Sequence, residues 1–131
     1  MTHWTDLLVD AAPVRAIYGS SPPLLEGVDL HEMSLHRDGP RLLLRFDLHG
    51  FPDHPPAKWS ASGLNRVQMR LLAVGVENLQ ISGFSSNMRM DLRIVKEGPL
   101  VRLCGQNEHA KFGLRTEFVM VDGISAYRQG D

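Results

Sequence analysis

From residue 28 to residue 127 the chain repeatedly alternates apolar and polar side chains with a period of two. The clearest example carries apolar residues at 88, 90, 92 and 94 and polar residues at 89, 91 and 93. A β-strand has this period because its successive side chains point to opposite faces of a sheet, whereas an α-helix repeats every 3.6 residues. The pattern therefore predicts a protein made mainly of β-strands.

About seven or eight such segments follow one another, joined mainly by short turns such as Arg37–Pro40 and Lys96–Pro99. Short turns make neighbouring strands pair antiparallel. A slip in the alternation near His31 predicts a β-bulge. We expect an antiparallel meander that curls into a sandwich-like or partly open barrel sheet. The later strands are expected to include residues 112–118 and residues 124–127.

The first 18 residues have helical rather than strand spacing. Four apolar residues share one helical face: Trp4, Leu7, Leu8 and Ala11. Thr2 or Thr5 is a candidate N-cap, Pro13 should interrupt the helix, and Gly19 should end a further turn. We therefore expect one short N-terminal helix beside the sheet.

Length and composition indicate one globular domain over residues 1–131. The hydrophobic fraction of 43% and the charged fraction of 22% are ordinary for a soluble protein. No apolar run approaches the ~18 residues of a membrane-spanning helix, so we expect no membrane association. A net charge of −1 lacks the basic excess that is typical of nucleic-acid binders. The sequence leaves the oligomeric state open, a homodimer included.

Two features favour a cytoplasmic location. Asp6 and Asp10 stand where a secretory signal would need basic and then apolar residues. The single cysteine, Cys104, has no partner for an internal disulfide.

The sequence contains no pattern that predicts an enzyme. Cys104 lacks a preceding helix N-terminus to activate it, so we interpret it as a packing residue. The G-x-S-x-G elbow and the phosphate-binding glycine motifs are absent. Asp47, Asp91 and Glu117 alternate with arginines, which favours cross-strand ion pairs on a solvated face. The alternative for this face is a charged surface that contacts a protein.

The longest irregular segment is His49–Trp59, which contains three prolines and two large aromatic residues. His49, Asp53 and His54 are suitable metal ligands by type, but their spacing matches no metal motif and the prolines restrict wrapping around an ion. We therefore expect no metal and no cofactor. Histidines that are solvated or hydrogen-bonded are the simpler interpretation.

The same prolines favour a second role for this segment, contact with a partner protein. A stiff segment loses little conformational entropy on binding. Phe51 and His54, together with Lys58, are the predicted contacts, because they combine an aromatic anchor with polar rim groups. Trp59 is assigned to the core instead.

Between Tyr18 and Gly83 the chain resembles the Immunity protein 50 family of bacterial polymorphic-toxin systems. The features that carry the resemblance are Tyr18-Gly19, Pro22-Pro23-Leu24-Leu25, Leu30-His31-Glu32, His36-Arg37-Asp38-Gly39, Leu44-Arg45-Phe46-Asp47-Leu48, Phe51-Pro52, Pro55-Pro56-Ala57-Lys58-Trp59 and Asn65-Arg66-Val67-Gln68. The resemblance implies a small non-enzymatic protein that binds and neutralises a cognate toxin domain, with no catalytic residue to carry over. The alternative hypothesis is a β-rich module that binds a small ligand or a metal, with the His49–His54 loop at the rim of its site.

Overall fold

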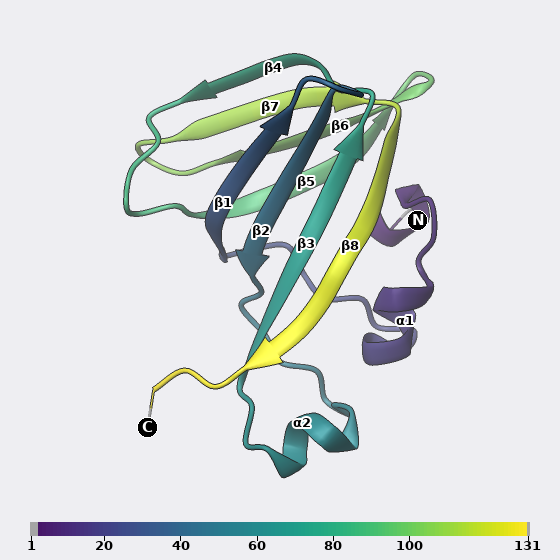
Figure 1. Cartoon of the computed structure of the whole chain (residues 1–131), viewed down its shortest axis with the longest axis vertical. Coiled ribbons are helices and arrows are strands. Elements are labelled where there is room, and N and C mark those ends of the chain that lie inside the picture. The colour runs from purple at the N-terminus through teal and green to yellow at the C-terminus, as the bar shows by residue number, and fades with distance from the viewer. Residues whose placement is uncertain (1–2, 131) are drawn as a thin grey trace.

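A computed structural model describes residues 3–130 and contains one unclosed sheet of eight antiparallel strands with short helical segments (Figure 1). The fold is mainly β with a short N-terminal helix, as the sequence predicted. The elements in chain order are the 3-10 helix η1 (Trp4–Leu7), α1 (Ala12–Tyr18), β1 (Val28–His36), β2 (Arg41–Asp47), α2 (Ala57–Ala61), β3 (Arg66–Val74), β4 (Glu77–Ser82), β5 (Arg89–Glu97), β6 (Leu100–Gln106), β7 (Lys111–Thr116) and β8 (Phe118–Tyr127).

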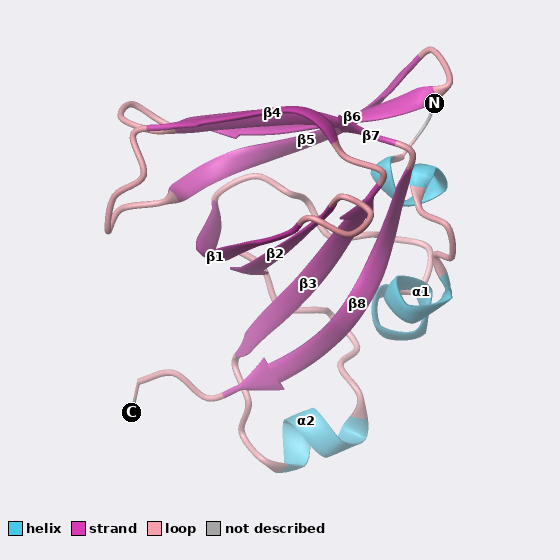
Figure 2. Ribbon diagram, turned by 45° about the horizontal axis from the view of Figure 1, so that its top comes forward, coloured by secondary structure: helices cyan, strands magenta, loops and turns pink. Residues whose placement is uncertain are grey.

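The strand order is β4-β7-β6-β5-β1-β2-β3-β8. Strands that follow one another pair within β1-β2-β3 and within β5-β6-β7, as their short turns predict. The pairs β3–β8 and β4–β7 join strands that are distant in sequence. β1 and β5 pair only at Val28↔Met90 and Asp29↔Arg89, so the sheet turns sharply there. Figure 2 shows the result, with β4-β7-β6-β5 lying across β1-β2-β3-β8.

The inward rows of both halves of the sheet form one hydrophobic core. Phe46 of β2, Met69 of β3 and Leu103 of β6 are completely buried. Burying a large apolar side chain contributes roughly 1.5–3 kcal/mol, so these alternating rows supply the main driving force for the fold. The predicted inward residues of β3, Val67, Met69 and Leu71, are all in this core.

The N-terminal segment differs in detail from the predicted helix. η1 ends at Leu7, and extended Leu8 forms a parallel bridge with Val119 of β8. Pro13 lies in the first turn of α1 instead of interrupting a helix, because the missing N–H of proline costs nothing there. Gly19, at φ 62°, ends α1 as predicted. Thr5 does not cap η1, and the other candidate cap, Thr2, lies outside the described residues.

Two strand boundaries also differ from the predicted ones. The segment predicted as one strand over residues 112–118 is divided at Glu117, where the chain passes from β7 to β8. Thr116 stabilises this corner through a hydrogen bond from its hydroxyl to the carbonyl of Val74, 2.7 Å long. β8 begins at Phe118 rather than at 124, because a bulge at Asp122 interrupts the alternation that the prediction relied on.

Other local predictions are confirmed. The register between β1 and β2 shifts between Leu30 and Glu32, which is the predicted bulge. Residues 37–40 form the turn between these two strands. Across residues 3–130, no helix is long and apolar enough to span a bilayer.

Candidate functional site

The segment that connects β2 to β3 projects beyond the ends of these strands (Figure 1). It is irregular as far as Pro56, and α2 then begins at Ala57, so the predicted loop is wrong for its last three residues. Pro56 stands just before this helix with φ −52°, and its carbonyl accepts a hydrogen bond of 2.9 Å from the N–H of Trp59. The fixed φ of proline suits a helix start, which explains the difference.

Two aromatic residues attach this segment to the body of the protein. Phe51 and Trp59 are half-buried, and both pack against the hydrophobic core. Their ring centroids are 6.1 Å apart with an interplanar angle of 50°, a tilted aromatic contact. The position of Trp59 agrees with the core role expected for it, while Phe51 contacts the core and the surface together.

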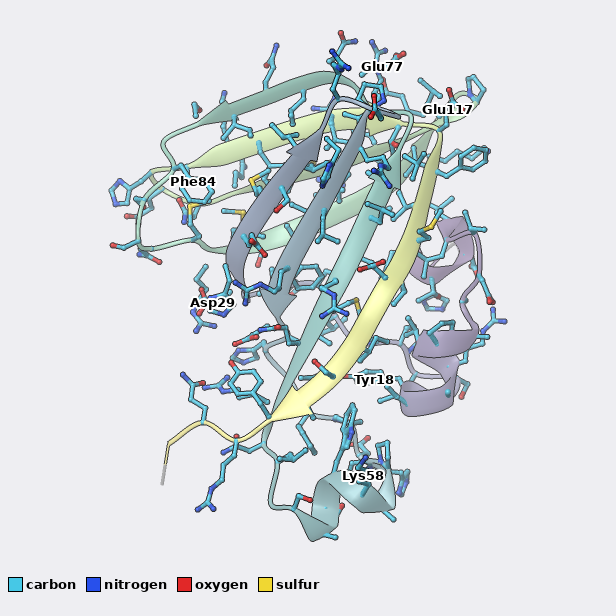
Figure 3. The ribbon with its side chains drawn as sticks, viewed as in Figure 1. Tyr18, Asp29, Lys58, Glu77, Phe84 and Glu117 are labelled. Carbon is cyan, nitrogen blue, oxygen red and sulfur yellow. The ribbon has the colours of Figure 1, made fainter. Side chains whose placement is uncertain are left out.

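A cavity of about 900 Å³ separates this segment from α1 and the residues that follow α1. Phe51 and His54 both line the cavity, and Leu24, 71% exposed, lies on the opposite wall. Lys58 is exposed on α2 and is not part of the lining (Figure 3). The structure therefore brings Phe51 and His54 to one cavity and leaves Lys58 apart from it.

Tyr18, at the end of α1, is a lining residue that the sequence reasoning did not identify. Its hydroxyl is buried without a hydrogen-bond partner among residues 3–130. Burial raises the pKa of Tyr18 to about 12, so its phenol is neutral at physiological pH. Periodicity could not place this residue, because α1 and the β2–β3 segment meet only in the folded protein.

The three residues suggested as metal ligands by the alternative hypothesis lie in this same region. His49, Asp53 and His54 all line the cavity. Within the described part of the chain, however, no group of three or more His, Cys, Asp or Glu side chains is placed to hold a metal ion.

A second polar cluster lies around Asp47 on the outer face of β1, β2, β3 and β8. Asp47 is only 6% exposed, so the prediction that it lies on a solvated face is wrong. One carboxylate oxygen accepts hydrogen bonds from Nε2 of His31, at 3.0 Å, and from the hydroxyl of Tyr127. The other accepts from the side-chain amide of Gln68, at 3.2 Å. These side chains from β1, β3 and β8 cover the carboxylate.

The surroundings of Asp47 keep its carboxyl group ionised. Burial alone would raise its pKa, but the hydrogen bonds from Tyr127, His31 and Gln68 together hold the pKa below its usual value. Burial and the bond to the carboxylate raise the pKa of Tyr127 to about 12. Both Asp47 oxygens accept hydrogen bonds, so the cluster connects the four strands β1, β2, β3 and β8.

Cross-strand ion pairs form, but not with the predicted acidic residues: Asp91 and Glu117 are exposed, and neither has an ion-pair partner within residues 3–130. Arg45 of β2 lies 3.1 Å from Glu32 of β1, and Arg70 of β3 lies 3.4 Å from Asp122 of β8. Pairs exposed to this degree contribute about 0–1 kcal/mol each, so they are a minor part of the stability.

The family model for Immunity protein 50 matches residues 10–127 of the 131-residue chain. The chain belongs to the Immunity protein 50 family. The motifs that resemble this family lie between residues 18 and 83, whereas the match extends well beyond them and includes β4 to β8. Comparisons with curated proteins and with solved structures gave no match.

Membership implies that this chain is an immunity protein, and therefore that it has a protein partner. The elements of this Immunity protein 50 member that form the cavity, α1 and the β2–β3 segment, both lie inside the matched region. Phe51, His54 and Lys58 lie there as well.

Proposed function

We propose that this protein binds a cognate toxin domain of a bacterial polymorphic-toxin system and neutralises it without catalysis. The observation that supports the proposal is the family match over residues 10–127. The single cysteine, half-buried and without a disulfide, is consistent with action in the cytoplasm of the toxin-producing cell.

We assign part of the toxin contact to the exposed side of the β2–β3 segment. Pro52, Pro55 and Pro56 restrict its backbone, so little conformational entropy remains to be lost on binding. Phe51 is held by its contact with Trp59 and is therefore a positioned aromatic anchor. His54 and Lys58 are exposed and supply polar groups at the edge of the contact.

The test of this surface is survival of cells that produce the toxin domain encoded beside the immunity gene. The wild-type immunity protein is expected to protect them, and the Phe51→Ala/His54→Ala/Lys58→Ala variant is expected to protect them less. The loss in toxin affinity should be about 2 kcal/mol or more if an anchor is removed.

A matched control exists elsewhere on the molecule. Phe84 is 56% exposed and His109 is also exposed, and Figure 3 shows Phe84 far from Lys58. The Phe84→Ala/His109→Ala variant should protect as well as the wild type. If both variants protect equally well, the β2–β3 segment is not part of the interface. If the wild-type protein does not protect the cells, the proposed function is wrong.

The cavity supports a second candidate function, the binding of a small ligand. Its volume of about 900 Å³ lies within the range of roughly 300–1,000 Å³ that is typical of ligand sites. A thermal-shift screen of metabolites distinguishes the two functions. A compound that stabilises the wild-type protein but not an Ile17→Trp variant, which obstructs the cavity wall, would favour ligand binding.

A further inference from the structure

A second cavity, of about 990 Å³, lies over β4, β7, β6 and β5, away from the β2–β3 segment. Register explains its floor. Arg93 of β5 pairs with Cys104 of β6, Cys104 pairs with Gly113 of β7, and Gly113 pairs with Gln80 of β4. These residues alternate with the inward row, so their side chains face outward. In the middle of this row Cys104 has a short side chain and Gly113 has none, and the depression that results is called the outer groove here.

Longer side chains border the depression on both sides. Towards one end of the strands lies a row that pairs in register and consists of Asp91, Gln106, Lys111 and Ser82. Towards the other end lies Arg102, which also lines the outer groove. The outer groove therefore runs across all four strands, with long polar walls over a floor of small residues.

The outer groove has an excess of positive charge although the whole chain carries −1. Its cations are Arg93, Arg102 and Lys111, and its one acidic residue is Asp91. One carboxylate oxygen of Asp91 is already engaged by the backbone N–H of Gly27 at 2.8 Å. Within residues 3–130, no carboxylate oxygen lies within 4 Å of a side-chain nitrogen of Arg93 or Lys111.

Neighbouring arginines on the same face already bind carboxylates of the chain itself. Arg115 lies 3.5 Å from Glu77, which is labelled in Figure 3, and 3.7 Å from Glu97. Arg102 lies 3.9 Å from Glu97. Carboxylates thus pair with Arg102 and Arg115 at one end of this face, while Arg93 and Lys111 have no such partner within residues 3–130.

The chemistry of the outer groove fits an acidic protein segment better than a nucleic acid. Single-stranded nucleic acids stack their bases on exposed aromatic rings, and the only aromatic lining residue, Phe112, is 4% exposed. Crossing four strands requires about 14 Å, or roughly four extended residues. Amides at Gln80 and Gln106 offer further hydrogen-bond donors to carboxylates.

We propose that the outer groove binds a short acidic segment of the cognate toxin domain, through Arg93 and Lys111. This inference rests on the proposed function, because it names a second part of the same contact. It differs from the β2–β3 contact in its chemistry, which is electrostatic and therefore weakens as salt concentration rises.

The experiment measures toxin-domain affinity for three variants of the 131-residue chain. Arg93→Ala/Lys111→Ala removes the unpaired cations, and its Kd should rise about tenfold at low salt, or ~1.4 kcal/mol. Arg37→Ala/Arg128→Ala makes the same change in net charge at exposed residues outside the outer groove, and its Kd should change less than about twofold.

The third variant, Gly113→Val, raises the floor of the outer groove without changing charge. A Cβ at Gly113 would make ordinary contacts, 3.7 Å from Cβ of Cys104 and 3.9 Å from Nη2 of Arg102, so the variant should fold. Circular dichroism and urea unfolding verify this. Its Kd should also rise about tenfold, since an occupant of the outer groove loses its space.

The outcomes separate the two proposals. If the wild type binds the toxin domain and the Arg93/Lys111 and Gly113 variants bind equally well, the outer-groove inference is wrong and the proposed function stands. If the wild type does not bind the toxin domain, the proposed function is wrong, and so is the assignment of a toxin segment to the outer groove. A single-stranded oligonucleotide that binds the wild type but not the Arg93→Ala/Lys111→Ala variant would instead identify the outer groove as a nucleic-acid site.

Discussion

At the scale of single residues, Asp47 shows how an outward position on a strand becomes buried. The alternation of β2 correctly predicts that its side chain points outward, but it does not predict that other side chains bury it. The cover comes from Tyr127, at the end of β8, and from His31, the extra residue of the β1 bulge. Because the carboxylate is ionised and the phenol is neutral, each group shifts the pKa of the other away from neutral pH.

Asp47 should contribute stability that depends on pH. Its pKa is lower in the folded than in the unfolded chain, so its contribution is complete above the ordinary carboxyl value and is lost as pH falls below about 4. Asp47→Asn should lower the free energy of unfolding by about 1.5–3 kcal/mol at pH 7 and by less at pH 3. Urea unfolding at both pH values measures this. Asp38→Asn, in the exposed β1–β2 turn, is the control, and equal pH dependence in the wild type and Asp47→Asn would contradict the account.

The two tyrosines of the chain should both titrate late. The pKa of Tyr18 and that of Tyr127 are each raised to about 12. Because the pKa of each phenol is higher in the folded than in the unfolded chain, its contribution to stability is complete below the unfolded pKa of about 10. This contribution is lost as pH rises through about 12. Ultraviolet absorbance should therefore detect almost no phenolate near pH 10 while circular dichroism still reports a folded chain, whereas urea-unfolded protein should be half-ionised there. A folded-state midpoint near 10 would show that neither hydroxyl is buried as described.

At the scale of elements, the two halves of the sheet share little backbone pairing, because β1 and β5 pair over so short a stretch. Packing between the inward rows therefore has to hold the halves together. The same holds for α2, whose attachment to the sheet depends on Trp59 rather than on strand pairing.

Gly105 of β6 tests how tightly the inward row of the β4-β7-β6-β5 half is packed. A Cβ at this position would lie 2.8 Å from side-chain atoms of Leu92, Met90 and Phe112. Gly105→Ala should lower the free energy of unfolding by about 1–3 kcal/mol through overpacking. Gly113→Ala on the neighbouring strand faces outward and should be nearly neutral. Denaturant unfolding of the two variants gives the comparison, and similar stabilities would refute the tight inward packing.

Trp59 tests the attachment of α2. Trp59→Ala should lower the free energy of unfolding by at least about 2 kcal/mol, since a half-buried indole leaves the core surface. Its exposed neighbour on the same helix, Lys58→Ala, should change stability by less than about 0.5 kcal/mol. Thermal and urea unfolding measure both, and a neutral Trp59→Ala would show that the side chain does not pack on the core.

At the scale of the whole molecule, the sequence predicts what is local and misses what is distant. The alternation places residues such as Leu92 and Met69 inward, and the turn at Gly98 gives the β5–β6 pairing. The pairing of β3 with β8 and of β4 with β7 has no local signal, because it depends on how the sheet curls. For the same reason the sequence places Phe51 and His54 in one segment but gives no sign that Tyr18 lines the same cavity from α1.

The central claim, that this Immunity protein 50 member neutralises a toxin by binding it, is tested most directly by titrating the purified protein into the toxin domain encoded beside it. Calorimetry and the activity of the toxin domain are followed in the same samples. The account predicts a saturable complex with equal numbers of the two chains, and loss of toxin activity in proportion to its formation. A fully active toxin domain that shows no heat of binding at micromolar concentrations would contradict it.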